Sequence, residues 1–353
     1  MQHNLFFLKE PNTKMNFSEN NCWNDSLKQA IKTPEALISY LELDSDYLIK
    51  ISRKAQSVMP IMVPLSFASR IKKGDINDPI LLQIFPSIKE EIDTDINFTI
   101  DPLMEQSQMP AKGIIHKYQG RVLLICNGVC AVHCRYCFRR EFDYKESTAS
   151  KLSWDKYFEY IDNDKSINEV ILSGGDPLLL TDQHLKFFID KVLNIKHIKR
   201  LRVHSRVPIV LPERITDNLV NILSDNRLQT VLVTHVNHAN ELDDEVKHVL
   251  NKFQGRATLL NQSTLLKNIN DCAHTLAYLS EKLFDFGVLP YYLHTLDKVR
   301  GTKHFHVTDR EAWEIHSKLQ SMLPGFLVPK IVKEVPYKSN KIQLSDFLFD
   351  PNF

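Results

Sequence analysis

From about residue 115 onward, short apolar runs alternate with longer stretches whose spacing favours amphipathic helices. Polar or turn residues bound each run, which is typical of buried parallel strands. The six runs are Val122–Cys126, Glu169–Leu172, Arg200–Val203, Thr230–Thr234, Ala257–Leu260 and Gly287–Leu293. Strand and helix alternating about six times predict a parallel α/β barrel, complete or partial.

The stretches between the strands carry helix-start signals. Thr181 is placed to cap one helix, and Thr308 with Glu311 matches a capping box. Ser153 is expected to cap a helix that begins directly after it. We expect three parts, namely a mainly helical N-terminal extension over 1–110, a barrel over 111–324 and a C-terminal segment over 325–353.

Polar residues follow each predicted strand. After the second strand comes Ser173-Gly174-Gly175-Asp176, in which paired glycines let the backbone approach a ligand closely. Each group alone is weak evidence, since Gly-Gly-Asp is more often a turn. Because the carboxyl ends of barrel strands converge on one face, we expect these groups to form a polar rim there. The others are His204-Ser205-Arg206, His235 to Glu241, Asn261-Gln262-Ser263 and His294 to Asp297.

Composition narrows the class of protein. The chain is 43% apolar and 25% charged, which is ordinary for a globular protein. Its net charge of +1 gives no electrostatic argument for a nucleic-acid partner. No apolar stretch reaches the roughly 18–20 residues that a membrane helix needs, so we expect no spanning segment. The clustered cysteines favour a reducing compartment, the cytoplasm.

Three of the six cysteines fall close together. Cys130, Cys134 and Cys137 have the spacing C-x3-C-x2-C. Three thiolates at this spacing can hold three irons of a cubic [4Fe–4S] cluster, and the run contains no fourth cysteine. The sequence therefore predicts a cluster with one iron left open for a substrate or cofactor.

Zinc and disulfide bonds fit these cysteines less well. A structural zinc site normally has four Cys or His ligands in paired units, and His133 lies between two cysteines rather than at the spacing of a second pair. A disulfide framework is typical of short secreted chains, whereas this chain has 353 residues. A non-catalytic iron–sulfur or zinc-binding module stays open at this point.

The cysteine run, with the aromatic Tyr136 before its last cysteine, resembles the radical S-adenosylmethionine (SAM) superfamily. In that superfamily the open iron binds the amino and carboxylate groups of SAM, which is reduced to methionine and a 5′-deoxyadenosyl radical. The resemblance implies an α/β fold, a partial (β/α)6 radical SAM barrel with an N-terminal helical extension. It also implies a [4Fe–4S] cluster and SAM as cofactors.

Further motifs resemble one family, the lysine 2,3-aminomutases, over about residues 90–345. These enzymes use SAM, a [4Fe–4S] cluster and pyridoxal phosphate (PLP) to move the α-amino group of lysine to the β carbon. The resemblance thus implies an isomerase, an intramolecular aminotransferase. The motifs are Gly174-Gly175-Asp176, Thr234 to His238, Asn261-Gln262-Ser263 with Asn270-Asp271, and Pro290-Tyr291-Tyr292.

The resemblance also implies roles by position. Arg139 matches the arginine that pairs with the substrate carboxylate, a task suited to a bidentate guanidinium. Asp271 and Glu334 match the acidic pair that receives the side-chain ammonium of lysine. Further cofactor-binding positions are Lys117, Tyr118 and Arg121 around the start of the first strand, and Ser173, Gly174, Gly175, Asp176, Arg206, His235 and Gln262 on the rim.

PLP requires a lysine that can form a Schiff base with it. In the family this lysine lies seven residues after an acidic side chain, which here gives Glu334 and Lys341. Lys341 is therefore the expected catalytic lysine. The glycine-rich linker of the family is replaced by residues 337–340, so Lys338 is an alternative. Without the resemblance, both would be interpreted as solvated lysines.

One subgroup of the family fits better than the metabolic enzymes. The chain ends soon after Lys341, and three motifs resemble the EpmB-type proteins, which make (R)-β-lysine for attachment to translation elongation factor P. L-lysine, an external electron donor, a β-lysine ligase and elongation factor P are the expected partners. The motifs are Asp101 to Gln106, Cys137-Phe138-Arg139-Arg140 and Leu293 to Val299.

Two alternatives within the family remain. One is a metabolic lysine 2,3-aminomutase, and the other is an aminomutase that acts on another amino acid such as glutamate. Asp271 and Glu334 argue against glutamate, because two carboxylates repel an acidic side chain.

Overall fold

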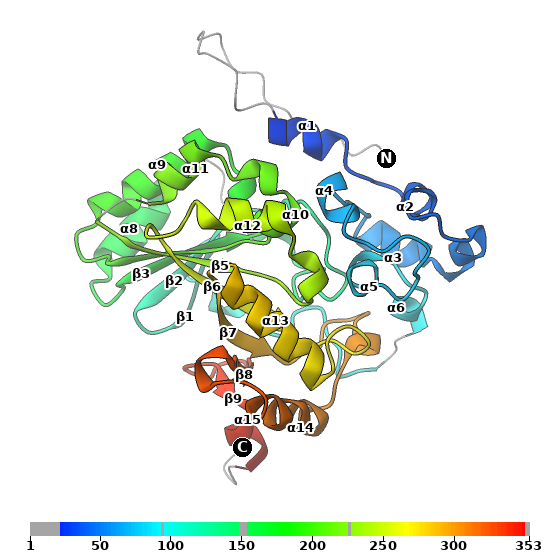
Figure 1. The fold of residues 1–353 in the computed structure, drawn as a ribbon. Coiled ribbons are helices and arrows are strands. Elements are labelled where there is room, and N and C mark those ends of the chain that lie inside the picture. Colours follow the sequence, from blue (N-terminus) through cyan, green and yellow to red (C-terminus); the bar gives the residue numbers. More distant parts are fainter. Residues whose placement is uncertain (1–21, 93–94, 148–153, 225–226, 350–353) are drawn as a thin grey trace.

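The computed structural model describes residues 22–92, 95–147, 154–224 and 227–349. Its centre is a nine-stranded sheet whose strands follow one another in chain order (Figure 1). Strands β2 to β8 are parallel, while β1 and β9 pair antiparallel at the two ends. The strands are β1 (Ile114–Tyr118), β2 (Arg121–Asn127), β3 (Glu169–Gly174), β4 (Arg200–His204), β5 (Gln229–Thr234), β6 (Thr258–Thr264), β7 (Leu289–His294), β8 (Lys330–Lys333) and β9 (Ile342–Gln343).

The six predicted strands are confirmed as β2 to β7. Strand β3 is buried at all its positions, as expected for a strand covered on both faces. Strand β6 runs on to Thr264, so Gln262 lies in the strand and not after it. The polar Asn261 fits inside β6 because its side chain bonds to Thr234 and to the backbone of Val236.

The sheet is a partial barrel. In the described part of the chain β1 and β9 each pair with one strand only, so the ring is not closed. Strand β8 was not predicted, because Lys330–Lys333 is too short to show a hydrophobic period. It pairs parallel with β7 and brings the C-terminal residues against the barrel.

Helices connect the parallel strands and cover the outside of the sheet (Figure 1). Thr181 caps α9, since its hydroxyl accepts a hydrogen bond from the N–H of His184 at 3.3 Å. Thr308 and Glu311 form the predicted capping box of α14. Ser153 lies outside the described residues. The helices are α7 (Tyr144–Ser147), α8 (Asp155–Asn163), α9 (Asp182–Asn194), α10 (Val207–Val210), α11 (Asp217–Leu223), α12 (Asp244–Asn251), α13 (Ala273–Asp285), α14 (Asp309–Gln320) and α15 (Leu344–Phe349).

The N-terminal part is helical and packs beside the barrel (Figure 1). Arg70 anchors it to the barrel through Asp243, with a nitrogen–oxygen distance of 2.5 Å. The hydroxyl of Ser66 donates to the carbonyl of Val210 at 3.2 Å. Its helices are α1 (Cys22–Lys28), α2 (Pro34–Tyr40), α3 (Arg53–Val58), α4 (Leu65–Ala68), α5 (Pro79–Ile84) and α6 (Lys89–Ile92).

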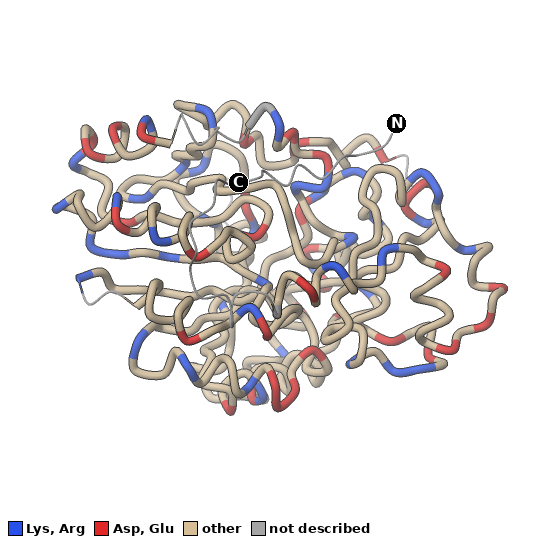
Figure 2. Tube along the Cα trace, turned by 90° about the horizontal axis from the view of Figure 1, so that it is seen from above, with Lys and Arg blue, Asp and Glu red and all other residues tan. Residues whose placement is uncertain are grey.

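Charged residues are spread over the molecule. Figure 2 shows basic and acidic positions interspersed along the whole trace, in keeping with the net charge of +1. Within the described ranges no helix combines the length and the apolar character needed to cross a bilayer.

Candidate active site

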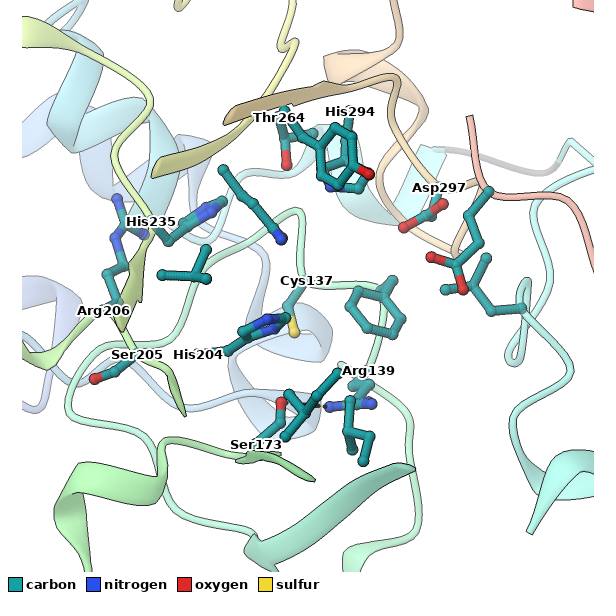
Figure 3. Close-up of a pocket in the computed structure, with 18 of the residues that line it drawn as sticks. Cys137, Arg139, Ser173, His204, Ser205, Arg206, His235, Thr264, His294 and Asp297 are labelled. Carbon is teal, nitrogen blue, oxygen red and sulfur yellow. Dashed lines mark hydrogen bonds between the residues drawn. The ribbon is translucent and has the colours of Figure 1, made fainter. Parts of the chain in front are cut away.

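A cavity of about 600 Å³ lies at the carboxyl ends of the parallel strands (Figure 3). It gathers residues from the cysteine loop, from the strand ends and from the C-terminal segment. Of the residues proposed from sequence, those that line it are Lys117, Tyr118, Arg121, Cys130, Cys134, Cys137, Arg139, Ser173, Gly174, Gly175, Asp176, Arg206, His235, Gln262, Glu334 and Lys341.

The three clustered cysteines are free thiols in the loop after β2. Burial raises the pKa of Cys137 to about 11, and the neighbouring Cys134 adds to the shift. Binding iron therefore has to displace protons from these thiols. Among the described residues no three His, Cys, Asp or Glu side chains converge on a single metal ion. The thiols of a cubic cluster are spaced more widely, because each binds a different iron.

Two glycines after β3 allow the chain to pass close to the cysteine loop. Gly174 has a φ of +121°, a conformation that L-residues rarely adopt. A Cβ on Gly175 would lie 2.3 Å from the carbonyl oxygen of Val129, which belongs to the backbone next to Cys130. Only glycine fits here. The sequence had predicted a close approach to a ligand, and the close neighbour in the structure is the backbone of the cysteine loop.

Asp176 joins the loop after β3 to the loop after β4. Its buried carboxylate accepts hydrogen bonds from the Ser205 hydroxyl at 2.7 Å and from the Arg206 backbone at 2.8 Å. Burial raises the pKa of Asp176 to about 6. The carboxylate thus ties the end of β3 to the end of β4.

Arg206 belongs to a buried polar network on one side of the cavity. Its guanidinium pairs with Glu241 at 2.8 Å and donates to Gln83 at 2.7 Å. Next to it, the hydroxyl of Tyr136 bonds to Nε2 of His235 at 2.7 Å. Burial lowers the pKa of His235 to about 4, so the imidazole is neutral at neutral pH. Gln83 comes from the N-terminal part, which therefore supports the wall residue Arg206 from outside the cavity.

Lys341 lines the cavity from the position directly before β9. Its ammonium contacts the carboxylate of Glu334, which also accepts from Lys117 at 2.9 Å. Burial opposes ionisation of Glu334, but the two ammonium groups outweigh it and hold the pKa of this carboxyl well below its usual range. Lys338 is exposed and is not part of the cavity wall. The geometry favours Lys341 over Lys338.

Arg139 is buried beside the end of β3. Its Nε and Nη2 atoms donate to the carboxylate of Glu105 at 2.7 and 2.9 Å. Nη1 lies 3.3 Å from both the Ser173 hydroxyl and the Gly174 carbonyl (Figure 3). The guanidinium is therefore held in a fixed orientation at the cavity wall.

Asp271 is the exception among the residues proposed from sequence. It is absent from the cavity wall, and its carboxylate accepts a hydrogen bond from the N–H of Asn268 in the loop before α13. Asp297, in the loop after β7, lines the cavity instead (Figure 3). Burial and then the nearby Glu334 raise the pKa of Asp297 to about 7. Asp297, in a rim group that the sequence had indicated, is thus a cavity carboxylate near Glu334, whereas Asp271 is not.

Comparison with known proteins shows the family of the chain. Residues 124–261 match the radical SAM superfamily. An L-lysine 2,3-aminomutase of Buchnera aphidicola is 46% identical, over 95% of this chain and 98% of its own. The Escherichia coli protein of that name is 43% identical, over 91% and 94% of the two chains. That of Clostridium subterminale is 34% identical, over 89% of this chain and 76% of its own.

This chain belongs to the lysine 2,3-aminomutase family. Membership in this radical SAM family implies a [4Fe–4S] cluster, SAM and PLP as cofactors. The cavity of this aminomutase-family protein fits all three. Three free thiols lie on one loop, and Gly174 and Gly175 bring a second loop against it. Lys341 lines the same cavity as the cationic Lys117 and Arg121.

The sequence did not assign Glu105 and Asp297 to the site of this aminomutase-family protein. Both side chains line the cavity. The charges of Lys117 and Glu334 influence the pKa of both carboxyl groups. Each residue lies in a motif by which the sequence resembles one subgroup of the family, but the motif did not indicate what the side chain does. The pairings that give them a role join segments far apart in the chain.

Proposed function

We propose that this protein converts L-lysine to β-lysine by moving the amino group from carbon 2 to carbon 3, a radical SAM and PLP-dependent isomerisation. One observation carries the proposal: a single cavity combines the three thiols of a cluster site, a lysine suited to PLP and an arginine suited to a carboxylate. The three parts lie in different segments of the chain, and the fold brings them to one face of the barrel.

Cys130, Cys134 and Cys137 would hold the cluster. The cavity residues around them, Ser173 to Asp176, Arg206, His235 and Gln262, would hold SAM. When bound, the cluster and SAM supply a carbon radical that can abstract hydrogen from an unactivated carbon. Asp176 would act by holding the two strand ends together, since its oxygens bond to Ser205 and to backbone N–H groups.

Lys341 would form the covalent bond to PLP, and Lys117, Tyr118 and Arg121 would contact PLP. Tyr118 stacks with Arg121, whose guanidinium lies 4.5 Å from the ring centre. Lys341 lies against Glu334, which keeps the amine in place before PLP arrives. Bound PLP supplies a conjugated ring system that stabilises an unpaired electron during the migration of nitrogen.

Substrate lysine would be recognised at both ends. Arg139 would receive its carboxylate, and Glu334 with Asp297 would receive its side-chain ammonium. Asp297 replaces Asp271 in this role because only Asp297 lines the cavity. Two carboxylates at the distal end disfavour an acidic side chain, which argues against glutamate as the substrate.

We further propose that the β-lysine is the R form, and that it serves a β-lysine ligase that modifies translation elongation factor P. Identity is higher to the Buchnera aphidicola and Escherichia coli proteins, at 46% and 43%, than to the Clostridium subterminale protein, at 34%, and this supports the EpmB-type subgroup over the metabolic enzymes. An external reductant would supply the electron, and the oxygen-sensitive chemistry suits the cytoplasm.

We also propose that the chain divides into a helical extension over residues 1–110, a barrel over 111–324 and a C-terminal segment over 325–353.

An anaerobic assay tests the proposal. Protein reconstituted with iron, sulfide and PLP is incubated with dithionite, SAM and L-lysine, and the amino acids are separated on a chiral column. Formation of (R)-β-lysine is the expected result. If 5′-deoxyadenosine forms without β-lysine, lysine is not the substrate. If neither forms in protein with a full cluster, the aminomutase assignment fails.

A further inference from the structure

Glu105 is held in the cavity wall by a tight turn. The carboxylate of Asp101 accepts hydrogen bonds from the backbone N–H groups of Glu105 at 3.0 Å and Gln106 at 3.3 Å. Met104, just before it, has a φ of +51°, in the left-handed region that L-residues seldom adopt. Glu105 itself is 4% exposed. A turn of this kind fixes where the Glu105 carboxylate points.

The carboxylate of Glu105 is aligned with one edge of Arg139. The two nitrogen–oxygen distances, 2.7 and 2.9 Å, describe a bidentate pair that uses the Nε and Nη2 atoms of the guanidinium. Burial disfavours the charge on Glu105, but Arg139 outweighs this effect and the pKa of Glu105 is lowered. The pair is therefore ionised at neutral pH, and paired arginine donors with this geometry are strongly directional.

Aromatic rings complete the restraint on Arg139. Its guanidinium carbon lies 4.9 Å from the ring centre of Phe138 and 5.7 Å from that of Phe142. With Glu105 on one edge, the end formed by Nη1 and Nη2 is the part that can meet a ligand. Within the described ranges the hydrogen bonds of Nη1 are long, 3.3 Å to Ser173 and to Gly174. The carboxylate of a ligand could replace Ser173 and Gly174 as the acceptor of the Nη1 hydrogen bonds, while the ion pair between Arg139 and Glu105 stays intact.

Glu105 also connects Arg139 to the opposite part of the site. Lys117 lies 3.5 Å from Glu105 and 2.9 Å from Glu334, which in turn contacts Lys341. Positive and negative groups thus alternate from Arg139 to Lys341 along the cavity wall. Because Lys117 shares the charge of Glu105, Arg139 retains attraction for a second carboxylate.

We propose that Glu105 is a positioning residue for substrate recognition: it holds Arg139 so that its Nη1–Nη2 end faces the cavity and selects a ligand with an α-carboxylate. Glu105 acts through Arg139 and does not contact the substrate. This inference rests on the proposed function, in which Arg139 binds the carboxylate of lysine.

The test compares two amines, L-lysine and cadaverine, which is lysine without its carboxylate. Their binding to PLP-loaded protein is measured by equilibrium dialysis, without reductant, so that no turnover is needed. Glu105→Gln keeps the size of the side chain and removes its charge. We expect Glu105→Gln to weaken L-lysine binding by about tenfold or more, equivalent to about 1.4 kcal/mol, and to leave cadaverine binding within about twofold of wild type.

A second variant and a control guard against general damage. Glu105→Asp keeps the charge and withdraws the carboxylate by one methylene, and we expect an intermediate loss for L-lysine alone. Asp182→Asn neutralises a carboxylate that pairs with the buried Arg214 at 2.7 Å, outside the cavity wall, and should leave the ratio of the two affinities unchanged.

The outcomes separate this inference from the proposed function. Equal weakening of both amines in Glu105→Gln, or none in either, would overturn the positioning role while wild-type lysine binding stands. If wild-type protein itself binds L-lysine no better than cadaverine, Arg139 does not select a carboxylate, and the proposed function loses its basis at this residue.

Discussion

The carboxylate of Glu90 accepts hydrogen bonds from Nε and Nη2 of Arg135, at 2.9 and 2.7 Å. Arg135 stands between two cysteines of the candidate cluster loop and is fully buried. Glu90 also pairs with Arg140 at 2.5 Å, just beyond that loop. A single carboxylate from α6, in the N-terminal part, thus holds the chain at two points, directly after Cys134 and three residues after Cys137.

Glu90→Gln should therefore weaken the cluster loop. Breaking a buried ion pair from one side typically costs about 3–5 kcal/mol, because a charge is left without its partner. We expect fewer irons bound per chain after reconstitution and a lower urea midpoint of the apoprotein. Glu314→Gln, which removes an exposed carboxylate on α14, is the control. Unchanged iron content in Glu90→Gln would show that the loop does not depend on this pair.

Replacing Lys341 should abolish covalent PLP binding. Lys341→Ala removes the amine next to Glu334, so we expect the visible absorbance of bound PLP to disappear while the cluster absorbance persists. Lys338→Ala is the matched control, because Lys338 is exposed outside the cavity wall. Absorbance spectra of the two variants, after removal of free PLP, decide between the lysines. Loss of the PLP band in Lys338→Ala alone would reverse the assignment.

Lysine binding should depend on pH through Asp297. The pKa of Asp297 is raised to about 7, and only its ionised form attracts an ammonium group. As pH falls from 8 to 6 the carboxyl gains a proton, so the affinity for L-lysine should fall. Dialysis binding at several pH values measures this, and Asp297→Asn should flatten the dependence. A pH dependence that is unchanged in Asp297→Asn would assign it to another group.

The raised pKa of Asp297 also makes the free energy of unfolding depend on pH. Between the ordinary pKa of an aspartate and about 7, the unfolded chain has lost the proton that folded Asp297 keeps. Stability of the ligand-free protein therefore falls as pH rises through this window. Asp297→Asn should remove that part of the decline, seen as a smaller difference between urea midpoints at pH 5 and pH 8. An equal difference in both proteins would contradict it.

Gly175→Ala should disturb the cluster loop directly. The new Cβ would lie 2.3 Å from the carbonyl oxygen of Val129, and a backbone atom cannot move aside as a side chain can. Overpacking of this kind typically costs about 1–3 kcal/mol. We expect less iron bound per chain than in wild type. Gly325→Ala is the control, because its Cβ would meet no atom within 4 Å.

Local patterns in the sequence were sufficient for much of the architecture. The six apolar runs became β2 to β7, and Thr181 and Thr308 cap α9 and α14. These features depend on residues only a few positions apart, so the sequence pattern alone can predict them. The short strand β8 gave no such signal, because it is defined by its pairing with β7.

The sequence by itself determined the candidate ligands of the cluster, because the three cysteines lie within eight residues and a local spacing pattern can be recognised without the fold. Tertiary structure decided which carboxylates meet the cavity. Asp271 and Asp297 both follow barrel strands, yet the paths of their loops turn only Asp297 inward. Glu90 and Glu105 gain their roles from arginines 45 and 34 positions away. Contacts across such separations depend on how the whole chain packs, which no local pattern encodes.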